Sequence, residues 1–497
     1  MNQPEDNSST STSEEVLHDL YRQSHLFMRL AENALTVAES LRDNYFKNTA
    51  DFISDLRETM QRADQGQRSD PLLRVHQIGD QDWASLQGEI VTFVDGGIGG
   101  VQISSQVPIL LRVGSYTVKT GERRLAEREQ FRYYPVILGD LEGGSKERRD
   151  FPDIVRITAE LLGGLSALER TRDLRVLMFH GPLVYLMGAY AGHTPFTEGD
   201  IDLFLNHYAP NSDIASDIKE DFLKQAQLDI YPMLTERSDD WIEKRLFEPL
   251  AWMSYLYRRI IKVAKSRNPA PIIVGVVERG RSTDFSKEVL LKRVFRGLRR
   301  KGNTSHFNEM YGRTDLTSEE SLLDKLRYTD SLLLSMLLKP GQYSETWEMQ
   351  AKYEGLRRVD VSLPGESWTG RVDFSPLRPG KFGFPRVSGY YVHVSETTEP
   401  IRVEVFKDLS PSQVDEAARR TYMYARLLPG YGFPMGLDIA DKYSHVPNWL
   451  ADAYGKLIRY HLGVSLQTGS ISDAEMRRIL VQAIYMTNRD WLFRPDA

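Results

Sequence analysis

The chain of 497 residues contains no cysteine. This absence excludes a disulfide scaffold, a thiolate nucleophile and zinc sites built from cysteine. Long apolar runs are missing too, because the longest are strand-sized, such as Ile90–Val94, and a membrane span needs about 18 apolar residues. Residues 1–15 are polar and acidic and lack the basic and apolar regions of a secretory signal. We therefore expect a soluble, globular, cytoplasmic protein.

Charge of one sign is not in large excess, since 63 Lys and Arg oppose 69 Asp and Glu for a net charge of −6. A polyanion must therefore be bound by a local basic patch rather than by the overall field. Residues 287–301 contain the densest patch, with a single acid, Glu288. Its candidate DNA-binding residues are Lys287, Lys292, Arg293, Arg296, Arg299, Arg300 and Lys301. A solvated helix face or a contact to an acidic partner would explain the same pattern equally well.

Composition and periodicity divide the chain into successive regions. Residues 1–15 are expected to be a disordered acidic tail, and residues 16–70 a helical extension that covers its own core or packs on a partner subunit. The core is expected in two parts, 86–183 and 269–463, separated by a mostly helical insertion at 184–268. A basic helix is predicted at 287–301 and a helical C-terminal region at 464–497.

The core pattern is typical of an α/β fold with a mixed sheet. A short apolar strand rich in β-branched residues, Glu89–Asp95, precedes a glycine-rich segment at 96–100 that we interpret as a turn. The alternating segments that follow predict an antiparallel meander. The further predicted strands lie near 101–105, 109–118, 131–138, 175–179, 271–277, 390–394 and 401–405, and the main helices at 151–170, 330–338, 411–428 and 435–445. This order of elements is that of an RNase H-like nuclease.

Polar residues stand where such a fold places metal ligands. Asp95 ends a strand before two glycines, Glu160 borders the apolar stripe of a helix, and His180 ends a buried strand. Asp441 and His445 are four residues apart, so that both could reach a metal or the carboxylate could orient the imidazole. Two divalent cations held by such groups activate water and neutralise a leaving oxygen. Taken singly, Asp95 is better explained as a turn residue, Glu160 as an ordinary glutamate beside the apolar stripe, and His180 as a hydrogen-bonded histidine at a strand end. A solvated helix face would also explain Asp441 and His445.

From about residue 86 to 463, apart from the insertion, the chain resembles the NurA family of nucleases, which work with the hexameric HerA translocase in DNA-end processing. The matching pieces, in order, are Phe93-Val94-Asp95-Gly96, Ala159-Glu160, 177–183, 273–279, 329–341, 400–405, Gly432-Phe433-Pro434 and Ala440-Asp441. Each piece is weak alone, and their order over several hundred residues carries the resemblance.

The chain departs from the family pattern at two positions that bear on the site. His180 stands where the family has Asp, and Asp441 stands where it has His. If both positions share one metal cluster, the exchange preserves two Asp, one Glu and one His, which favours an active site. A decayed site, or a shifted alignment in which His445 is the family's histidine, would explain the same residues. Phe433 also replaces a frequent tyrosine.

The resemblance implies a metal-dependent deoxyribonuclease, a 5′→3′ exonuclease that also cuts single strands. Mn²⁺ or Mg²⁺ would be held by Asp95, Glu160, His180 and Asp441, with His445 as a further candidate. It also implies a homodimer, DNA as substrate and a HerA-type hexameric ATPase as partner, in repair or in defence against phage DNA. The alternative is a catalytically inactive adaptor that keeps the fold on the ATPase.

Overall fold

The computed structural model describes residues 21–22, 24–66, 71–79, 81–100, 109–138, 145–193, 195–208, 212–230, 247–278, 280–294, 328–362, 369–376, 382–428, 430–469 and 471–486. The chain divides into two compact units. One comprises Met1–Leu73 and Ser286–Tyr328, and the other comprises Arg74–Phe285 and Thr329–Ala497.

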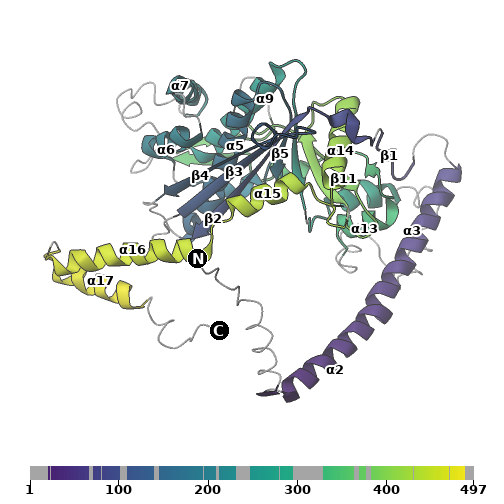
Figure 1. The fold of residues 1–497 in the computed structure, drawn as a ribbon, viewed down its shortest axis with the longest axis horizontal. Coiled ribbons are helices and arrows are strands. Elements are labelled where there is room, and N and C mark those ends of the chain that lie inside the picture. Colours follow the sequence, from purple (N-terminus) through teal and green to yellow (C-terminus); the bar gives the residue numbers. More distant parts are fainter. Residues whose placement is uncertain are drawn as a thin grey trace. The chain divides into compact units, whose positions relative to one another are not determined.

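The first unit is helical in its described part. The α-helices α2 (Ser24–Ser40) and α3 (Lys47–Gly66) are joined without a break by the π-helical turn η1 (Leu41–Phe46), and they form the long purple rod of Figure 1. A further π-helical segment, η5 (Ser286–Leu291), belongs to the same unit. Helix formation over 24–66 agrees with the predicted helical extension, since this stretch has neither proline nor an internal glycine.

A 10-stranded mixed sheet forms the second unit's centre, in the order β1-β7-β11-β12-β6-β5-β2-β3-β4, with β8 paired to β11. The strands are β1 (Val75–Gln77), β2 (Ile90–Gly100), β3 (Ile109–Lys119), β4 (Glu129–Leu138), β5 (Leu174–His180), β6 (Ile272–Val277), β7 (Gln342–Ser344), β8 (Trp347–Glu348), β11 (Val387–His393) and β12 (Ile401–Phe406). Strands β2, β5 and β6 run parallel, and the other pairs are antiparallel. The predicted mixed sheet and its β2–β3–β4 meander are therefore confirmed.

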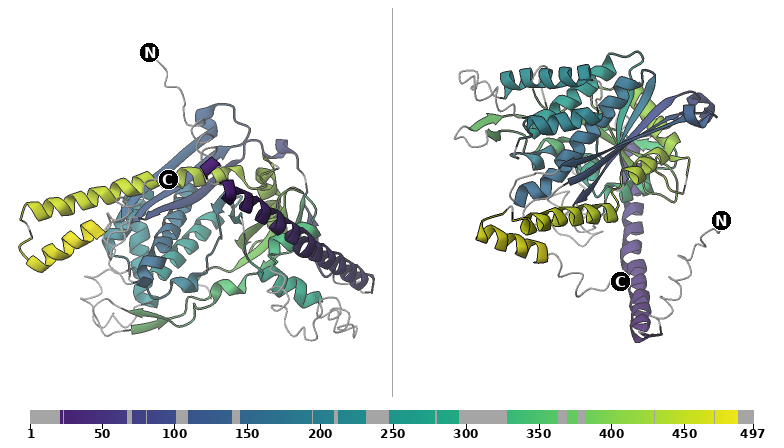
Figure 2. Two further views of the ribbon diagram at one scale, coloured as in Figure 1. Left: turned by 90° about the horizontal axis from the view of Figure 1, so that it is seen from below. Right: turned by 60° about the vertical axis from the view of Figure 1, so that its left-hand side comes forward.

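Helices cover both faces of this sheet, because successive strand residues point to opposite sides. Phe93 belongs to a buried cluster with Ala417 and Leu437, from α14 (Pro411–Ala425) and α15 (Met435–Ser444). Val94, its neighbour, lies instead beside Gly163 of α5 (Ser145–Arg170). Helix α9 (Pro249–Lys265) packs against α5. In the right-hand view of Figure 2, the blue and teal helices and the yellow-green helices accordingly lie on opposite sides of the strands.

Shorter elements complete the described part of this unit. They are η2 (Trp83–Leu86), α4 (Leu125–Arg128), η3 (Met187–Tyr190), α6 (Glu198–Tyr208), α7 (Ser212–Asp229), α13 (Asp330–Leu337), η6 (Gln350–Tyr353), the hairpin of β9 (Val359–Ser362) and β10 (Thr369–Val372), α16 (Asn448–Gln467) and α17 (Ala474–Met486). Among the helices that the structure describes, none combines the length and the apolar composition that a bilayer crossing requires.

The predicted turn at 96–100 is wrong, because β2 continues through these glycines to Gly100 and pairs with β3 along its whole length. The glycines serve close packing instead. A Cβ atom on Gly97 would lie 2.2 Å from the carbonyl oxygen of Ser444, and one on Gly164 of α5 would lie 2.4 Å from the ring of Phe179. Both distances are far below van der Waals contact, so larger residues would push the helices away from the sheet. The predicted strand near 101–105 lies outside the described residues.

Candidate metal centre

Three side chains from separate elements converge at one edge of the sheet: Asp95 of β2, His180 at the end of β5 and Asp441 of α15. Each offers one ligand atom, and these atoms lie within 4.8 Å of one another. Strands β2 and β5 are parallel neighbours with Val94 opposite Phe179, so Asp95 and His180 follow at the same edge. Strand alternation then turns both side chains toward the α15 face.

Asp95 is the most buried of the three, with 4% of its surface exposed. Its Oδ2 atom lies 3.2 Å from Nδ1 of His180 and 3.2 Å from the hydroxyl oxygen of Ser444. Ser444 belongs to the last turn of α15 and also lies 3.0 Å from the carbonyl oxygen of Asp441. The end of α15 is thereby fixed against β2 at Asp95.

The three groups carry an excess of negative charge. Burial raises the pKa of Asp441, and the neighbouring charge of Asp95 adds to this rise. For His180, burial acts to lower the pKa, but the hydrogen bond and charge of Asp95, together with Asp441, raise it overall. Within the described part of the chain, His180 is the only basic side chain in ion-pair contact with Asp95, and none contacts Asp441. A bound cation would relieve this repulsion.

Glu160 reaches the same edge from α5, on the other face of the sheet. A Cβ atom on Gly96 would lie 2.7 Å from Oε1 of Glu160, so the missing side chain makes room for this carboxylate next to Asp95. Its Oε1 accepts a 2.7 Å hydrogen bond from Arg156, and the Tyr185 hydroxyl lies 3.5 Å from its Oε2. Burial raises the pKa of Glu160 to about 7, although Arg156 opposes the rise. Glu160 is thus adjacent to the group of three but is already paired with the guanidinium of Arg156.

His445 lies outside this cluster. Helix α15 ends at Ser444, and His445 is its C-cap, with a φ of −55° and a ψ of 126°; among the described residues the group of close ligand atoms contains Asp441 and not His445. Its carbonyl oxygen accepts a 3.2 Å hydrogen bond from Arg112 of β3. Of the two residues spaced four apart on this segment, only the carboxylate takes part in the candidate centre. The ring of His180 instead packs edge-on against Phe433, with centroids 5.4 Å apart.

Three supporting residues were not identified from the sequence. Arg156 lies one helical turn before Glu160, and Ser444 lies one turn after Asp441, so helical spacing would have indicated both. Tyr185 carries no such signal, because only the fold of the loop after β5 brings its hydroxyl within 3.2 Å of Arg156.

The predicted basic helix at 287–301 is described only in part. Lys287 lies in the π-helical η5, and Lys292 and Arg293 lie in the helical residues that follow. Arg293 donates a 3.4 Å hydrogen bond to the carbonyl oxygen of Leu72 in the same unit. The remaining four candidates for DNA binding, Arg296, Arg299, Arg300 and Lys301, lie outside the described residues.

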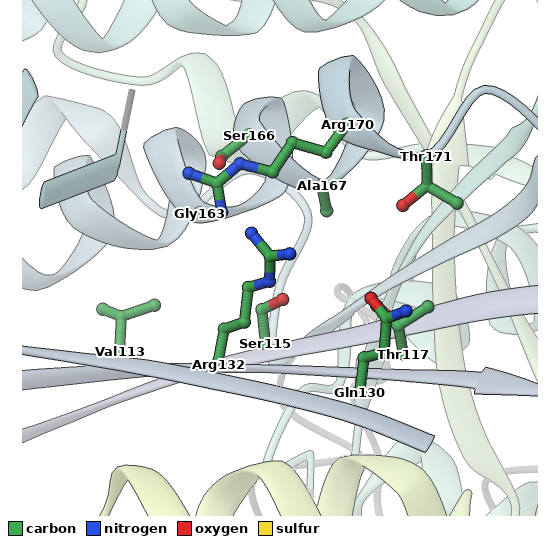
Figure 3. Close-up of a pocket in the computed structure, with 10 residues that line it drawn as sticks. All are labelled: Val113, Ser115, Thr117, Gln130, Arg132, Gly163, Ser166, Ala167, Arg170 and Thr171. Carbon is green, nitrogen blue, oxygen red and sulfur yellow. The ribbon is translucent and has the colours of Figure 1, made fainter. Parts of the chain in front are cut away.

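A separate pocket of about 500 Å³, counted with its open mouth, opens between β3, β4 and the C-terminal half of α5. Arg132 and Arg170 extend into it beside the hydroxyls of Ser115 and Ser166 (Figure 3). Ser115 pairs with Val94 of β2, and the pocket therefore lies on the α5 face. The ligand atoms of the candidate centre lie on the other face, and the pocket shares no residue with them.

Comparison with known proteins identifies the family. The model of the NurA domain matches residues 89–446, more than half of the chain, and the chain therefore belongs to the NurA domain family. This confirms the resemblance found in the sequence. A search among curated proteins finds no match.

Solved structures of NurA are similar to the chain at low identity. The NurA nuclease from Sulfolobus solfataricus is 12% identical, over 86% of this chain and 98% of that one, with a TM-score of 0.44. A NurA with manganese is 11% identical over 85% and 94%, with a TM-score of 0.33. A NurA bound to dAMP and manganese is 10% identical over 84% and 92%, with a TM-score of 0.31.

Proposed function

We propose that the chain is a metal-dependent nuclease in which Asp95, His180 and Asp441 hold a divalent cation. The observation that carries this proposal is that three ligand atoms, from strand β2, from the end of strand β5 and from helix α15, lie within 4.8 Å of one another. These residues are separated by long stretches of sequence, and no local motif would bring them together. Membership of the NurA domain family supports the same assignment.

The donor set fits Mn²⁺. Two carboxylates and one imidazole combine hard oxygen ligands with a borderline nitrogen ligand, a mixture that suits Mn²⁺ better than Mg²⁺. The surplus negative charge around Asp95 favours a cation at this position. When bound, such an ion supplies charge stabilisation for a phosphodiester and lowers the pKa of a water molecule.

The chain's own residues divide the remaining work. Asp95 is buried and fixed by Ser444, so it anchors the centre and orients His180 through Nδ1. Asp441 is exposed and faces the side from which a substrate would approach. Glu160 adds a third carboxylate from α5, held in position by Arg156. The inventory of two Asp, one Glu and one His that the exchange at positions 180 and 441 preserves is thus present at one edge of the sheet.

The finer parts of the proposal rest on the family resemblance. They are an RNase H-like fold, deoxyribonuclease activity with 5′→3′ exonuclease and single-strand endonuclease modes, a homodimer, and a HerA-type hexameric ATPase as partner. Repair and defence against phage DNA remain the two candidate roles. The basic residues at 287–301 are proposed to contact the DNA backbone in the cytoplasm, where phosphate contacts would give sequence-independent, salt-sensitive binding.

The proposal is tested by degradation of linear single- and double-stranded DNA with Mn²⁺, with Mg²⁺ and with EDTA. We expect degradation with Mn²⁺, less with Mg²⁺ and none with EDTA. Asp95→Ala should abolish it while the protein stays folded. Activity that survives Asp95→Ala would refute the site. Absence of activity with every metal, alone and with the cognate ATPase, would favour the inactive adaptor.

A further inference from the structure

The segment that follows His180 is fixed by buried charged side chains. The chain turns at Gly181, which has a φ of +91° and donates a 2.7 Å hydrogen bond to the carbonyl oxygen of Val276. It then passes over Gly275 of β6, where a Cβ atom would lie 2.3 Å from the Leu183 nitrogen. Only glycine leaves room for this close approach. The path of the chain immediately after the ligand is therefore set by contacts with β6.

Glu404 of β12 holds the backbone of this turn from below. Its side chain is fully buried, and Oε2 accepts a 2.9 Å hydrogen bond from the Leu183 N–H group. In the sheet, Glu404 pairs with Gly275 on one side and Gly389 on the other, so both neighbouring positions lack side chains. The space needed for a carboxylate and a crossing loop is thus built into three adjacent strands.

Lys352 of η6 completes this arrangement. It is 4% exposed, its Nζ lies 2.7 Å from Oε2 of Glu404, and it also donates to the carbonyl oxygen of Val184. Tyr257 of α9 donates a 2.6 Å hydrogen bond to the carbonyl oxygen of Leu183. Three backbone polar groups of the turn are therefore bound by side chains from three different elements.

Such a buried pair is costly to keep. Burial lowers the pKa of Lys352, against the opposing charge of Glu404. Replacing a buried ion pair with hydrophobic residues of similar volume often leaves the free energy of unfolding unchanged or raises it. Stability alone therefore does not account for the pair. What the pair does provide is a defined backbone position for Leu183 and Val184, three and four residues after a metal ligand.

We propose that Lys352 and Glu404 are positioning residues that hold the turn after β5 and thereby place the imidazole of His180 for metal binding. This inference rests on the proposed metal site. Groups that support metal ligands change metal affinity by about 10- to 100-fold when they are removed. Because this pair acts through three residues of backbone, we expect an effect at the lower end of that range.

The test is a titration of the full-length chain with MnCl₂, in which electron paramagnetic resonance measures free Mn²⁺. The double variant Glu404→Gln/Lys352→Met removes both charges of the pair, while Arg402, whose Nε lies 3.2 Å from Oε1 of Glu404, keeps its charge and loses this partner. We therefore expect the variant to unfold below the wild-type temperature, to be folded under the conditions of the titration, and to bind Mn²⁺ with a Kd about tenfold higher. Tyr257→Phe removes only the bond to Leu183 and should raise the Kd less, in the same direction.

A matched control is available directly before β2. Glu89 and Arg420 form a buried ion pair with an N–O distance of 2.8 Å, far along the strand from Asp95. The double variant Glu89→Gln/Arg420→Met should leave the Kd for Mn²⁺ unchanged. An equal rise of Kd in both double variants would mean general loosening of the sheet and would overturn the inference.

A spectroscopic signature separates positioning from stability. Pulsed electron paramagnetic resonance of bound Mn²⁺ should show ¹⁴N modulation from the imidazole in the wild type, none in His180→Ala, and weakened modulation in Glu404→Gln/Lys352→Met. A wild-type Kd and full modulation in the folded double variant, with an unchanged Kd in Tyr257→Phe, would overturn the inference. A wild-type chain that binds no Mn²⁺ would instead refute the proposed metal site.

Discussion

Two buried carboxylates lie along strand β2, Glu89 directly before its first residue and Asp95 near its middle, and their surroundings differ. At the start of the strand, Glu89 is paired with the guanidinium of Arg420 at 2.8 Å and accepts a 3.1 Å hydrogen bond from the Tyr424 hydroxyl. Asp95, which directly follows the last pair of β2 with β5, has an imidazole and a hydroxyl as partners and a second carboxylate beside it. The negative charge of Glu89 is therefore balanced by a guanidinium, whereas that of Asp95 is not.

This difference separates a structural ion pair from a candidate binding site. Burying a carboxylate is expensive, and Arg420 repays that cost within the folded chain. No guanidinium neutralises Asp95 among the described residues, and burial together with the charge of Asp95 raises the pKa of Asp441. An acid that the fold leaves uncompensated indicates a ligand of positive charge. Burial by itself would not distinguish Glu89 from Asp95, because both carboxylates are buried.

The largest expected contrast comes from neutralising each acid. Glu89→Gln removes the charge of one of the two carboxylates that pair with buried Arg420, the other being Glu416, and should lower the free energy of unfolding by about 2 kcal/mol, with DNA degradation per folded molecule retained. Asp95→Asn should abolish degradation and, without metal, should not lower stability, because an amide relieves repulsion with Asp441. Urea unfolding in EDTA and a nuclease assay measure both effects. Parallel loss of activity in the two variants would contradict the distinction.

Exchanging the two ligands beside Asp95, His180 and Asp441, provides the next test. His180→Asp and Asp441→His should each reduce activity by about a hundredfold, since each leaves an unsuitable ligand set. The double exchange restores one Asp and one His and should be at least about tenfold more active than either single variant. A double-mutant cycle measures this coupling, which is about 4 kcal/mol when each single variant loses a hundredfold and the double variant only tenfold. Additive losses would mean that the two residues do not share a metal.

Metal binding should stabilise only chains with an intact centre. At a free Mn²⁺ concentration about 100 times its Kd, the wild type should gain about 2.7 kcal/mol, and EDTA should remove this gain. Thermal unfolding with and without Mn²⁺ measures the shift. Glu89→Gln should show the same shift from a lower starting temperature, whereas Asp95→Asn should show none. A full shift in Asp95→Asn would place the metal elsewhere.

The smallest expected effect concerns Ser444. Its hydroxyl lies 3.2 Å from Asp95, so Ser444→Ala should cost about 1 kcal/mol of stability and weaken Mn²⁺ binding a few-fold. Ser335→Ala, which removes a hydroxyl bound to the Leu332 carbonyl of α13, is a matched control. It should leave Mn²⁺ affinity unchanged. Equal affinities in the two variants would mean that Ser444 does not support the centre.

Much of the fold follows from local pattern. Alternating residues correctly predicted β3, β4 and the β11–β12 ladder, and the apolar stripe predicted α5. The glycine run at 96–100 was misread, since glycine is typical both of turns and of strands that another element approaches closely. The decisive neighbour, the carbonyl oxygen of Ser444, lies more than 300 positions away in the sequence, so no local signal separates the two cases.

The sequence indicated which residue types form the candidate site, but not which of the candidate residues lie together in it. His445 seemed equivalent to Asp441 because residues four apart share a helical face. The helix ends at Ser444, shortly before Pro447, because a residue that precedes proline is disfavoured in helical backbone. Asp441 and His445 therefore do not share a helical face. Arg156 was missed although its spacing to Glu160 is regular. Its importance depends on Glu160 being buried, which is a property of the packed sheet.

By itself, the sequence determined which segments form strands and helices, since alternation and helical periodicity are local. It also supplied the chemistry of the candidate centre: carboxylates and an imidazole at the ends of apolar segments. Only the tertiary structure decided which of them meet. Parallel pairing of β2 and β5 places Asp95 beside His180, and close packing of α15 on glycines adds Asp441. The physical reason is that charge balance depends on neighbours in space, and those neighbours come from contacts distant in the sequence.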